Sequence, residues 1–210
     1  MNKKMSVSLT RKEKSELKKA LENKYSEILD LMQQFNNKIA PDQHIKETPK
    51  RISKMFVDEL LSGCFSDPPN MKKFKNDKSS NNPVIVDNIT IKSLCSHHFV
   101  PFRGHAVIYY IPDKYLSGLS KFPRICEYYS RRPQIQEELT QQICDHIYNE
   151  LKPKFVAVVM SAQHLCMLHR GINEYNSNCI TIAYKIKNKK LLKDISVENI
   201  TNLLLDRLNK

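Results

Sequence analysis

Two short clusters of cysteine and histidine carry the chemistry that this sequence can support. Residues 93–99 read SLCSHHF, and residues 164–166 read HLC. Thiolate sulfur and imidazole nitrogen are ligands that zinc prefers, and catalytic zinc sites keep three protein ligands with one position open for water. Two sulfurs and one histidine would complete such a Cys2His set. The two remaining histidines would then be free to transfer protons.

Ordinary packing is the alternative explanation for most cysteines and histidines of this chain. A single cysteine or histidine is most often a buried small residue or a core imidazole with satisfied hydrogen bonds. The scattered residues that fit this explanation are Cys64, Cys126, Cys144, Cys179, His44, His105, His146 and His169. It does not suit Cys95, His97 and His98, because packing gives no reason to place adjacent imidazoles beside a thiol. That cluster, together with residues 164–166, predicts a metal site.

A second set of residues is suited to phosphate. Ser120, Lys121 and Arg124 lie at the predicted start of a helix, where free backbone N–H groups and the helix dipole favour anions. Arg170 follows the second cysteine cluster closely, and arginine can bind phosphate with two parallel hydrogen bonds. Lys50 stands in the first turn of another predicted helix, where a cation opposes the dipole and hints at an anion or an acidic neighbour. The alternative is a solvated surface with ordinary cations.

Two polar residues open the longest predicted helix of the second half of the chain. Gln136 and Glu137 stand in its first turn. A carboxylate there is usually a favourable partner of the helix dipole. A Glu beside a Gln can also pair with the N–H groups of a purine or pterin ring, so both interpretations stay open.

The hydrophobic pattern predicts an α+β fold, with antiparallel strands and helices on one face of the sheet. Predicted helices cover residues 10–36, 48–63, 123–129, 135–151 and 196–208, and predicted strands cover residues 84–92, 105–111, 154–162 and 178–187. Thr10 with Glu13 has the spacing of a capping box, and Thr48 and Ser196 are predicted N-caps. The Cys-His-His cluster falls in the connection between the first two strands. His164 and Cys166 would project from the same side of an extended segment.

Length and composition indicate one domain, or a domain with a helical appendage, in a reducing compartment. The chain has 210 residues, 34 basic and 22 acidic side chains, a net charge of +12 and six cysteines. No secretory signal and no apolar run of membrane-spanning length is present, so a soluble cytoplasmic protein without a membrane partner is expected. The basic residues form no continuous stripe and carry no aromatic RNA-binding signature, so nucleic acid is not expected as a partner.

The chain resembles GTP cyclohydrolase I through a series of motifs that occur in the family's order. They are residues 47–63 (ETPKRISKMFVDELLSG), 95–99 (CSHHF), 110–112 (YIP), 118–121 (GLSK), 131–137 (RRPQIQE), 139–142 (LTQQ), 164–166 (HLC) and 170–171 (RG). The resemblance covers roughly residues 40–180 and, taken jointly, is far more specific than any one motif.

The resemblance implies a tunnelling (T-)fold subunit in a homo-oligomer, typically a decamer of two pentamers with active sites at subunit interfaces. On this basis, residues 1–63 would form an N-terminal helical region, residues 64–83 a polar loop, and residues 84–210 the T-fold catalytic domain. The implied reaction is hydrolysis of GTP at C8 of guanine with release of formate. Rearrangement and ring closure would then give 7,8-dihydroneopterin triphosphate, the first step of tetrahydrofolate or pterin biosynthesis.

The resemblance also implies a role for each candidate residue. Cys95, His98 and Cys166 would bind zinc, which activates water for attack on C8, and His97 and His164 would transfer protons. Glu137, with Gln136 beside it, would anchor the guanine edge. The triphosphate would be held by Ser120, Lys121, Arg124 and Arg170, with Lys50 reaching in from a neighbouring subunit.

Two features depart from the family pattern, and two other functions compete with it. Ser96 stands where an acidic residue is usual, and residues 176–184 replace the usual Thr- and Ser-rich strand.

A related pterin or deazapurine enzyme would not prefer GTP over guanosine. A non-catalytic zinc module that binds nucleic acid would need a fourth protein ligand, and chelation would unfold it.

Overall fold

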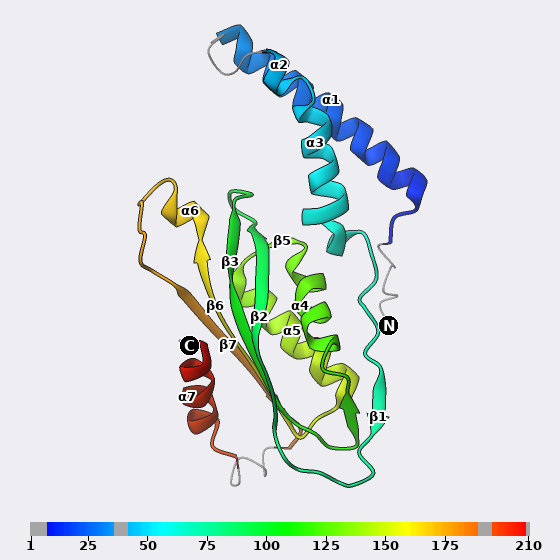
Figure 1. The fold of residues 1–210 in the computed structure, drawn as a ribbon, viewed down its shortest axis with the longest axis vertical. Helices are drawn as coiled ribbons and strands as arrows, with labels where there is room; N and C mark the ends of the chain where they lie inside the picture. Colours follow the sequence, from blue (N-terminus) through cyan, green and yellow to red (C-terminus); the bar gives the residue numbers. More distant parts are fainter. Residues whose placement is uncertain (1–7, 36–41, 189–194, 209–210) are drawn as a thin grey trace. The chain divides into compact units, whose positions relative to one another are not determined.

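The computed structural model describes residues 8–35, 42–188 and 195–208. The chain forms two compact units, Met1–Asp67 and Pro68–Lys210 (Figure 1). Their boundary falls inside the polar segment predicted at residues 64–83. No helix among the described residues has both the length and the apolar character that crossing a membrane requires.

The first unit is helical. Its elements are α1 (Arg11–Phe35), α2 (Asp42–Ile45), α3 (Thr48–Lys54), the π-helical turn η1 (Met55–Leu60) and the 3-10 turn η2 (Ser62–Cys64). The capping box is confirmed, since the Glu13 N–H donates to Thr10 Oγ1 at 3.2 Å and the Thr10 N–H donates to Glu13 Oε2 at 2.7 Å. The prediction of Thr48 as an N-cap is wrong. Glu47 is the N-cap of α3 and Pro49 is its second residue, where the missing N–H breaks no hydrogen bond within the helix.

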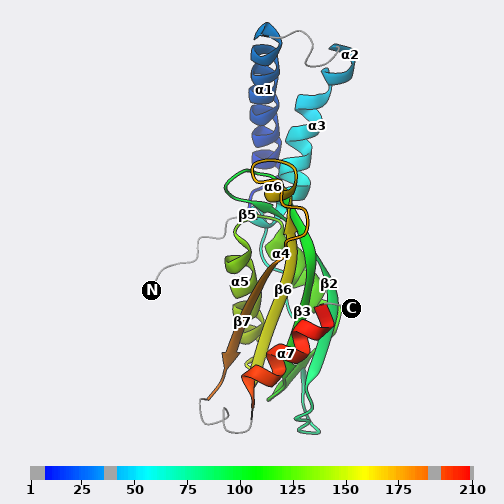
Figure 2. The ribbon, with the colours of Figure 1, turned by 90° about the vertical axis from the view of Figure 1, so that its left-hand side faces the viewer.

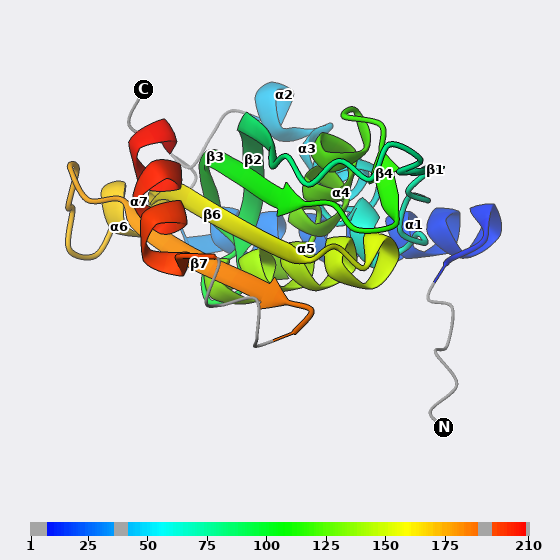
Figure 3. The same ribbon diagram turned by 90° about the horizontal axis from the view of Figure 1, so that it is seen from below.

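The second unit is built on a five-stranded sheet with the order β5-β2-β3-β6-β7. The strands are β2 (Val84–Cys95), β3 (Pro101–Ile111), β5 (Pro133–Gln134), β6 (Phe155–His164) and β7 (Cys179–Ile186). The four long strands pair antiparallel as predicted, whereas β5 runs parallel to β2. A separate pair, β1 (Lys73–Lys75) and β4 (Tyr115–Ser117), lies beside it in the same unit (Figure 3).

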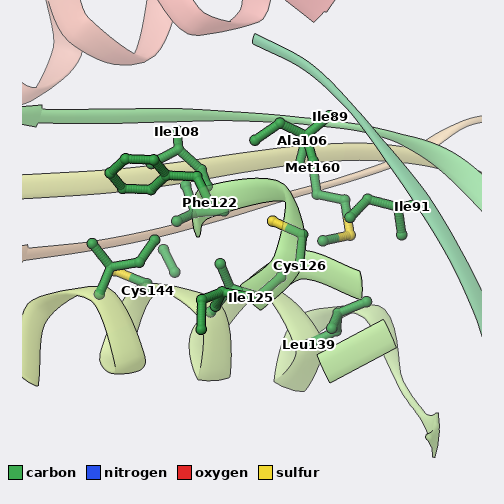
Figure 4. Close-up of a cluster of buried hydrophobic side chains, with 14 of the residues drawn as sticks. Ile89, Ile91, Ala106, Ile108, Phe122, Ile125, Cys126, Leu139, Cys144 and Met160 are labelled. Carbon is green, nitrogen blue, oxygen red and sulfur yellow. The ribbon is translucent and has the colours of Figure 1, made fainter. Parts of the chain in front are cut away.

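One face of the sheet packs on α4 (Lys121–Ser130) and α5 (Gln136–Leu151), which lie side by side (Figure 1). Apolar side chains of both helices meet alternate residues of the strands in one core (Figure 4). Fully buried members include Ile91, Ile108, Phe122, Ile125, Leu139, Ile143 and Val158. This core fixes the strand ends that carry the two cysteine clusters.

The opposite face of the sheet is covered by α7 (Val197–Leu208), which corrects the prediction of helices on one face only (Figure 2). Leu204 of α7 is fully buried against Val107, Phe155 and Val159. The physical reason is that β3 and β6 are apolar on both sides, so each face must be shielded from water. The Ser196 cap of α7 is confirmed, because the Asn199 N–H donates to its Oγ at 3.2 Å.

Close pairing of β3 and β6 sets the geometry of the sheet near the site. Gly104 lies opposite Ala162, and a Cβ atom on Gly104 would collide with the backbone of Ser161 and Ala162. The same register places Phe102 opposite His164. The two cysteine clusters therefore lie at the same end of the sheet.

Candidate metal centre

Cys95 is the last residue of β2, so the cluster begins inside a strand and not in the connection where it was predicted. Its N–H donates to the Val100 carbonyl at 2.9 Å, and the Phe99 N–H donates to the Cys95 carbonyl at 2.8 Å. These bonds close a tight turn in which Phe99 adopts a left-handed backbone with φ 53°. A bulky residue in this region of φ is unusual and indicates a backbone that the surrounding structure holds in place.

The turn places two imidazoles close to the Cys95 sulfur. Nδ1 of His97 lies 3.7 Å from Cys95 Sγ, and Nδ1 of His98 lies 3.9 Å from it. Both rings are exposed, whereas Cys95 is 6% exposed. Distance to Cys95 therefore does not distinguish the two histidines as ligands.

The second cluster is divided between two elements. His164 ends β6, whereas Cys166 lies in the short helix α6 (Leu165–Leu168). The prediction that both side chains project from one extended segment is therefore wrong. The backbone changes from extended to helical directly after His164, so Cys166 turns toward Cys95.

Cys95, His98 and Cys166 form a compact group of metal-ligand atoms, which all lie within 4.8 Å of one another. In a tetrahedral zinc site, bonds of about 2.0–2.3 Å place ligand atoms roughly 3.5–4 Å apart, so the group fits zinc after a small adjustment. Within the part of the chain that the structure describes, no fourth Cys, His, Asp or Glu belongs to the group. A three-ligand set with one open position is the arrangement of a catalytic site.

Electrostatics in the group depend on burial and on one arginine. Burial raises the pKa of the Cys166 thiol, the neighbouring Cys95 raises it further, and Arg170 acts in the opposite direction. Nη1 of Arg170 also lies 3.0 Å from Nε2 of His98. A metal cation would replace the thiol proton, because zinc binds the thiolate form.

His164 is half-buried beside the metal-ligand group. Burial lowers the pKa of His164, and the Glu137 carboxylate raises it in part. Its Nε2 lies 2.9 Å from Oε1 of Gln136, and its ring stacks on Phe102 with centroids 4.6 Å apart. The Gln136 side chain is thus engaged with the protein at 1% exposure, whereas Glu137 is exposed.

The predicted phosphate residues divide into two groups in this structure. Arg170 lies beside His98, but Ser120, Lys121 and Arg124 lie at the start of α4, far from the metal-ligand group. The end of α4 leads into β5, which pairs with Cys95, so the ten residues of α4 separate its start from the site by about 15 Å. One chain therefore does not bring the two groups together.

Lys50 belongs to the first unit, where it lies in α3 and approaches Glu47 at 3.9 Å. Its exposed side chain makes a surface ion pair of the kind that contributes little stability.

Three residues near the site were not identified from the sequence. Phe102 stacks on His164, and Thr140 and Thr181 contact Gln136. Thr140 falls within the motif at residues 139–142, so its place there was the available signal. Phe102 and Thr181 lie outside every motif, and only strand pairing brings them to the site.

The fold and the candidate site together define a class, an α+β protein with a Cys-His-Cys group that could hold a metal ion. The family model described as GTP cyclohydrolase I matches residues 21–199, so the chain belongs to the GTP cyclohydrolase I family. This confirms the resemblance seen in the motifs and extends it toward both ends of the chain.

Individual relatives agree with the family model. GTP cyclohydrolase 1 of Wigglesworthia glossinidia brevipalpis is 41% identical over 176 residues, which cover 80% of this chain and 79% of that protein. GTP cyclohydrolase 1 of Mannheimia succiniciproducens is 36% identical over 179 residues, which cover 85% of this chain and 80% of that protein. A solved structure of the archaeosine synthase QueF-Like in the apo form aligns with a TM-score of 0.42 and 17% identity, over 50% of this chain and 95% of that one.

Proposed function

We propose that this protein hydrolyses GTP at C8 of guanine, releases formate and forms 7,8-dihydroneopterin triphosphate. The observation that carries the proposal is the open Cys95, His98 and Cys166 group beside two further imidazoles, in a member of the GTP cyclohydrolase I family. The reaction would be the first step of tetrahydrofolate or pterin biosynthesis, and its place would be the cytoplasm.

Zinc is the proposed metal, held by Cys95, His98 and Cys166. Two sulfurs and one nitrogen favour zinc over magnesium or calcium, which prefer oxygen ligands. When bound, zinc would supply a Lewis acid that activates water for attack on C8.

His97 and His164 are the proposed proton-transfer groups. The exposed His97 ring is beside the Cys95 sulfur, where it can meet a substrate that enters from solvent. His164 is half-buried and held by two contacts, so its ring has one defined orientation. Two imidazoles in different surroundings suit the separate proton transfers that opening of the imidazole and ribose rings requires.

Glu137 is the proposed anchor of the guanine edge, with Gln136 beside it. The exposed Glu137 carboxylate stands next to the buried Gln136 in the first turn of α5 and acts electrostatically on His164. A carboxylate can accept two parallel hydrogen bonds from adjacent N–H groups of guanine. This would hold the base with its C8 side directed at the metal centre.

The triphosphate would be held by Arg170 of one chain together with Ser120, Lys121 and Arg124 of a second copy, with Lys50 also from a neighbour. The separation of about 15 Å between the start of α4 and the metal-ligand group supports this division between subunits. We propose a homo-oligomer of T-fold subunits, a decamer of two pentamers. The edge strand β7 supports association, because Ile180, Ile182 and Tyr184 are 45–50% exposed in a row along it.

The decisive test measures bound metal and formate release from GTP for wild type, Cys166→Ala and His164→Ala. Wild type should bind about one zinc per chain and release formate. Cys166→Ala should lose both, and His164→Ala should keep the zinc and lose turnover. Cys126→Ala is the matched control, because it removes a thiol from the core and should cost stability but retain zinc.

Two outcomes would contradict the proposal. Zinc-loaded wild type that releases no formate and no fluorescent pterin from GTP would overturn the activity. Equal turnover of GTP and guanosine would point to an enzyme that does not recognise the triphosphate.

A further inference from the structure

We infer that Gln136 is a positioning residue that fixes His164 as the tautomer with its proton on Nε2. Nδ1 is then the nitrogen that exchanges protons during the reaction. The inference concerns the hydrogen-bond network behind His164, and its catalytic meaning rests on the proposed function.

The position of Gln136 is fixed by its neighbours in the chain. It is the first residue of α5, directly after the extended Ile135. Two residues earlier, Gln134 pairs with Cys95 in the short parallel ladder between β5 and β2. The backbone that carries Gln136 is therefore tied to the strand end that carries the metal-ligand group.

The orientation of the Gln136 amide follows from what surrounds its nitrogen. Nε2 lies 3.0 Å from the Cys179 carbonyl, 3.0 Å from Thr181 Oγ1 and 3.3 Å from the Met160 carbonyl. Backbone carbonyl oxygens only accept hydrogen bonds, so the donor end of the amide must face them. Reversing the amide would set its oxygen against two carbonyls in a site that is 1% exposed, where such a repulsion is costly.

Two threonines complete the network without a conflict. Thr140 Oγ1 donates to the backbone carbonyl of Gln136 at 2.9 Å. The hydroxyl oxygen of Thr140 therefore accepts in the contact of 2.6 Å with Thr181 Oγ1. Thr181 is then the donor in that contact and accepts from Gln136 Nε2. Every hydroxyl proton has one acceptor, and the amide orientation is consistent with all of them.

With the amide fixed, Oε1 of Gln136 faces Nε2 of His164 at 2.9 Å. An amide oxygen has no proton to give, so Nε2 of the imidazole must be the donor. In a neutral ring the lone pair is then on Nδ1. Phe102 holds the plane of the ring, because the two rings stack with an angle of 11° between them.

This arrangement would raise the fraction of His164 that is ready to react. A histidine in the wrong tautomer presents a proton where a lone pair is needed, so only the fraction of His164 in the right tautomer can react. Partners that orient a metal-ligating histidine typically change activity or metal affinity by 10–100-fold when they are removed, and we expect an effect of the same order on activity for the partner of His164.

The test combines kinetics with nitrogen-15 magic-angle-spinning NMR of the zinc-loaded protein, labelled at histidine, with His164→Asn to assign the His164 signals. Wild type should show His164 protonated at Nε2. Gln136→Met, which keeps the length of the side chain and removes the acceptor, should lose this preference. Its kcat should fall by about 10–100-fold, with the KM for GTP changed by less than about threefold.

Thr181→Val is the matched control, since it removes a hydroxyl from the same network and leaves the acceptor for His164. It should keep the Nε2–H tautomer. Wild-type His164 protonated at Nδ1 would overturn the inference, as would Gln136→Met with an unchanged tautomer. A raised KM with unchanged kcat would make Gln136 a substrate contact and would also overturn it. Failure of the proposed function is separable, because absence of formate from GTP leaves the NMR result readable.

Discussion

Arg170 and His98 are in direct contact, with Nη1 of the guanidinium 3.0 Å from Nε2 of the imidazole. A guanidinium has only donors, so this pair can be hydrogen-bonded only when Nε2 of His98 carries no proton, whereas a zinc ion on Nδ1 would leave the ring proton on Nε2. His98 belongs to the candidate metal centre and Arg170 to the candidate triphosphate set, so the contact joins the two sites. Removal of the Arg170 guanidinium should therefore weaken the binding of GTP while the three metal-ligand residues stay in place.

Arg170→Ala should raise the KM for GTP by roughly 10–100-fold, the effect of losing one charge-assisted contact to phosphate. Zinc content should stay near the wild-type value, because all three ligands remain. Steady-state kinetics and metal analysis would measure the two effects. Arg207→Ala is the control. It removes the ion pair that Arg207 of α7 makes with Asp87 of β2, and it should leave the KM for GTP unchanged. Loss of zinc in Arg170→Ala would instead make Arg170 a support of the metal centre.

Removal of zinc by a chelator should abolish turnover and leave the fold intact. The reason is that the core of the second unit consists of strand and helix side chains that do not depend on the metal for their packing. Circular dichroism and formate release before and after chelation, with zinc added back, would measure this. Unfolding on chelation would favour a structural metal site, as expected for a non-catalytic zinc module.

Stability should fall at alkaline pH because two thiols are buried in the core. Burial raises the pKa of Cys126 and of Cys144 from the ordinary value of 9.0 to about 12. Between these values the unfolded chain has lost the thiol proton and the folded chain has kept it, so the free energy of unfolding decreases as pH rises from 9 to 12. The expected slope is about 1.4 kcal/mol per pH unit for each thiol.

Urea unfolding at a series of pH values would measure this slope. Cys144→Ala should be less stable at neutral pH and should show a shallower decrease above pH 9. Equal slopes in wild type and variant would show that Cys144 does not contribute.

Gly104→Ala should destabilise the protein by about 2–4 kcal/mol or prevent folding. The added Cβ would meet the backbone of Ser161 and Ala162, which cannot move without separating β3 from β6. Gly118→Ala is the control, because its nearest neighbour is the Phe74 side chain at 4.0 Å. Thermal unfolding of both variants would measure the difference, and equal melting temperatures would contradict the close approach of the strands.

Local features of the fold could be predicted because they depend on residues close in sequence. The caps at Thr10 and Ser196 and the long helix that begins near residue 135 all arise from spacing within a few positions. The place of α7 could not be predicted in this way. Its apolar stripe indicates burial, but only the presence of a second apolar face on β3 and β6 decides where it packs.

The sequence by itself determined the donor types of the site and the family, since sulfur and imidazole ligands in ordered motifs are visible in one dimension. Tertiary structure decided which of them meet. Strand pairing and the helical turn after His164 bring Cys166 to Cys95, whereas the length of α4 keeps Ser120 away from them. It also decided that Gln136 faces His164, because that orientation depends on carbonyl groups contributed by strands far along the chain. Such contacts depend on which residues lie close together in space, and the number of residues between them in the sequence does not reveal this.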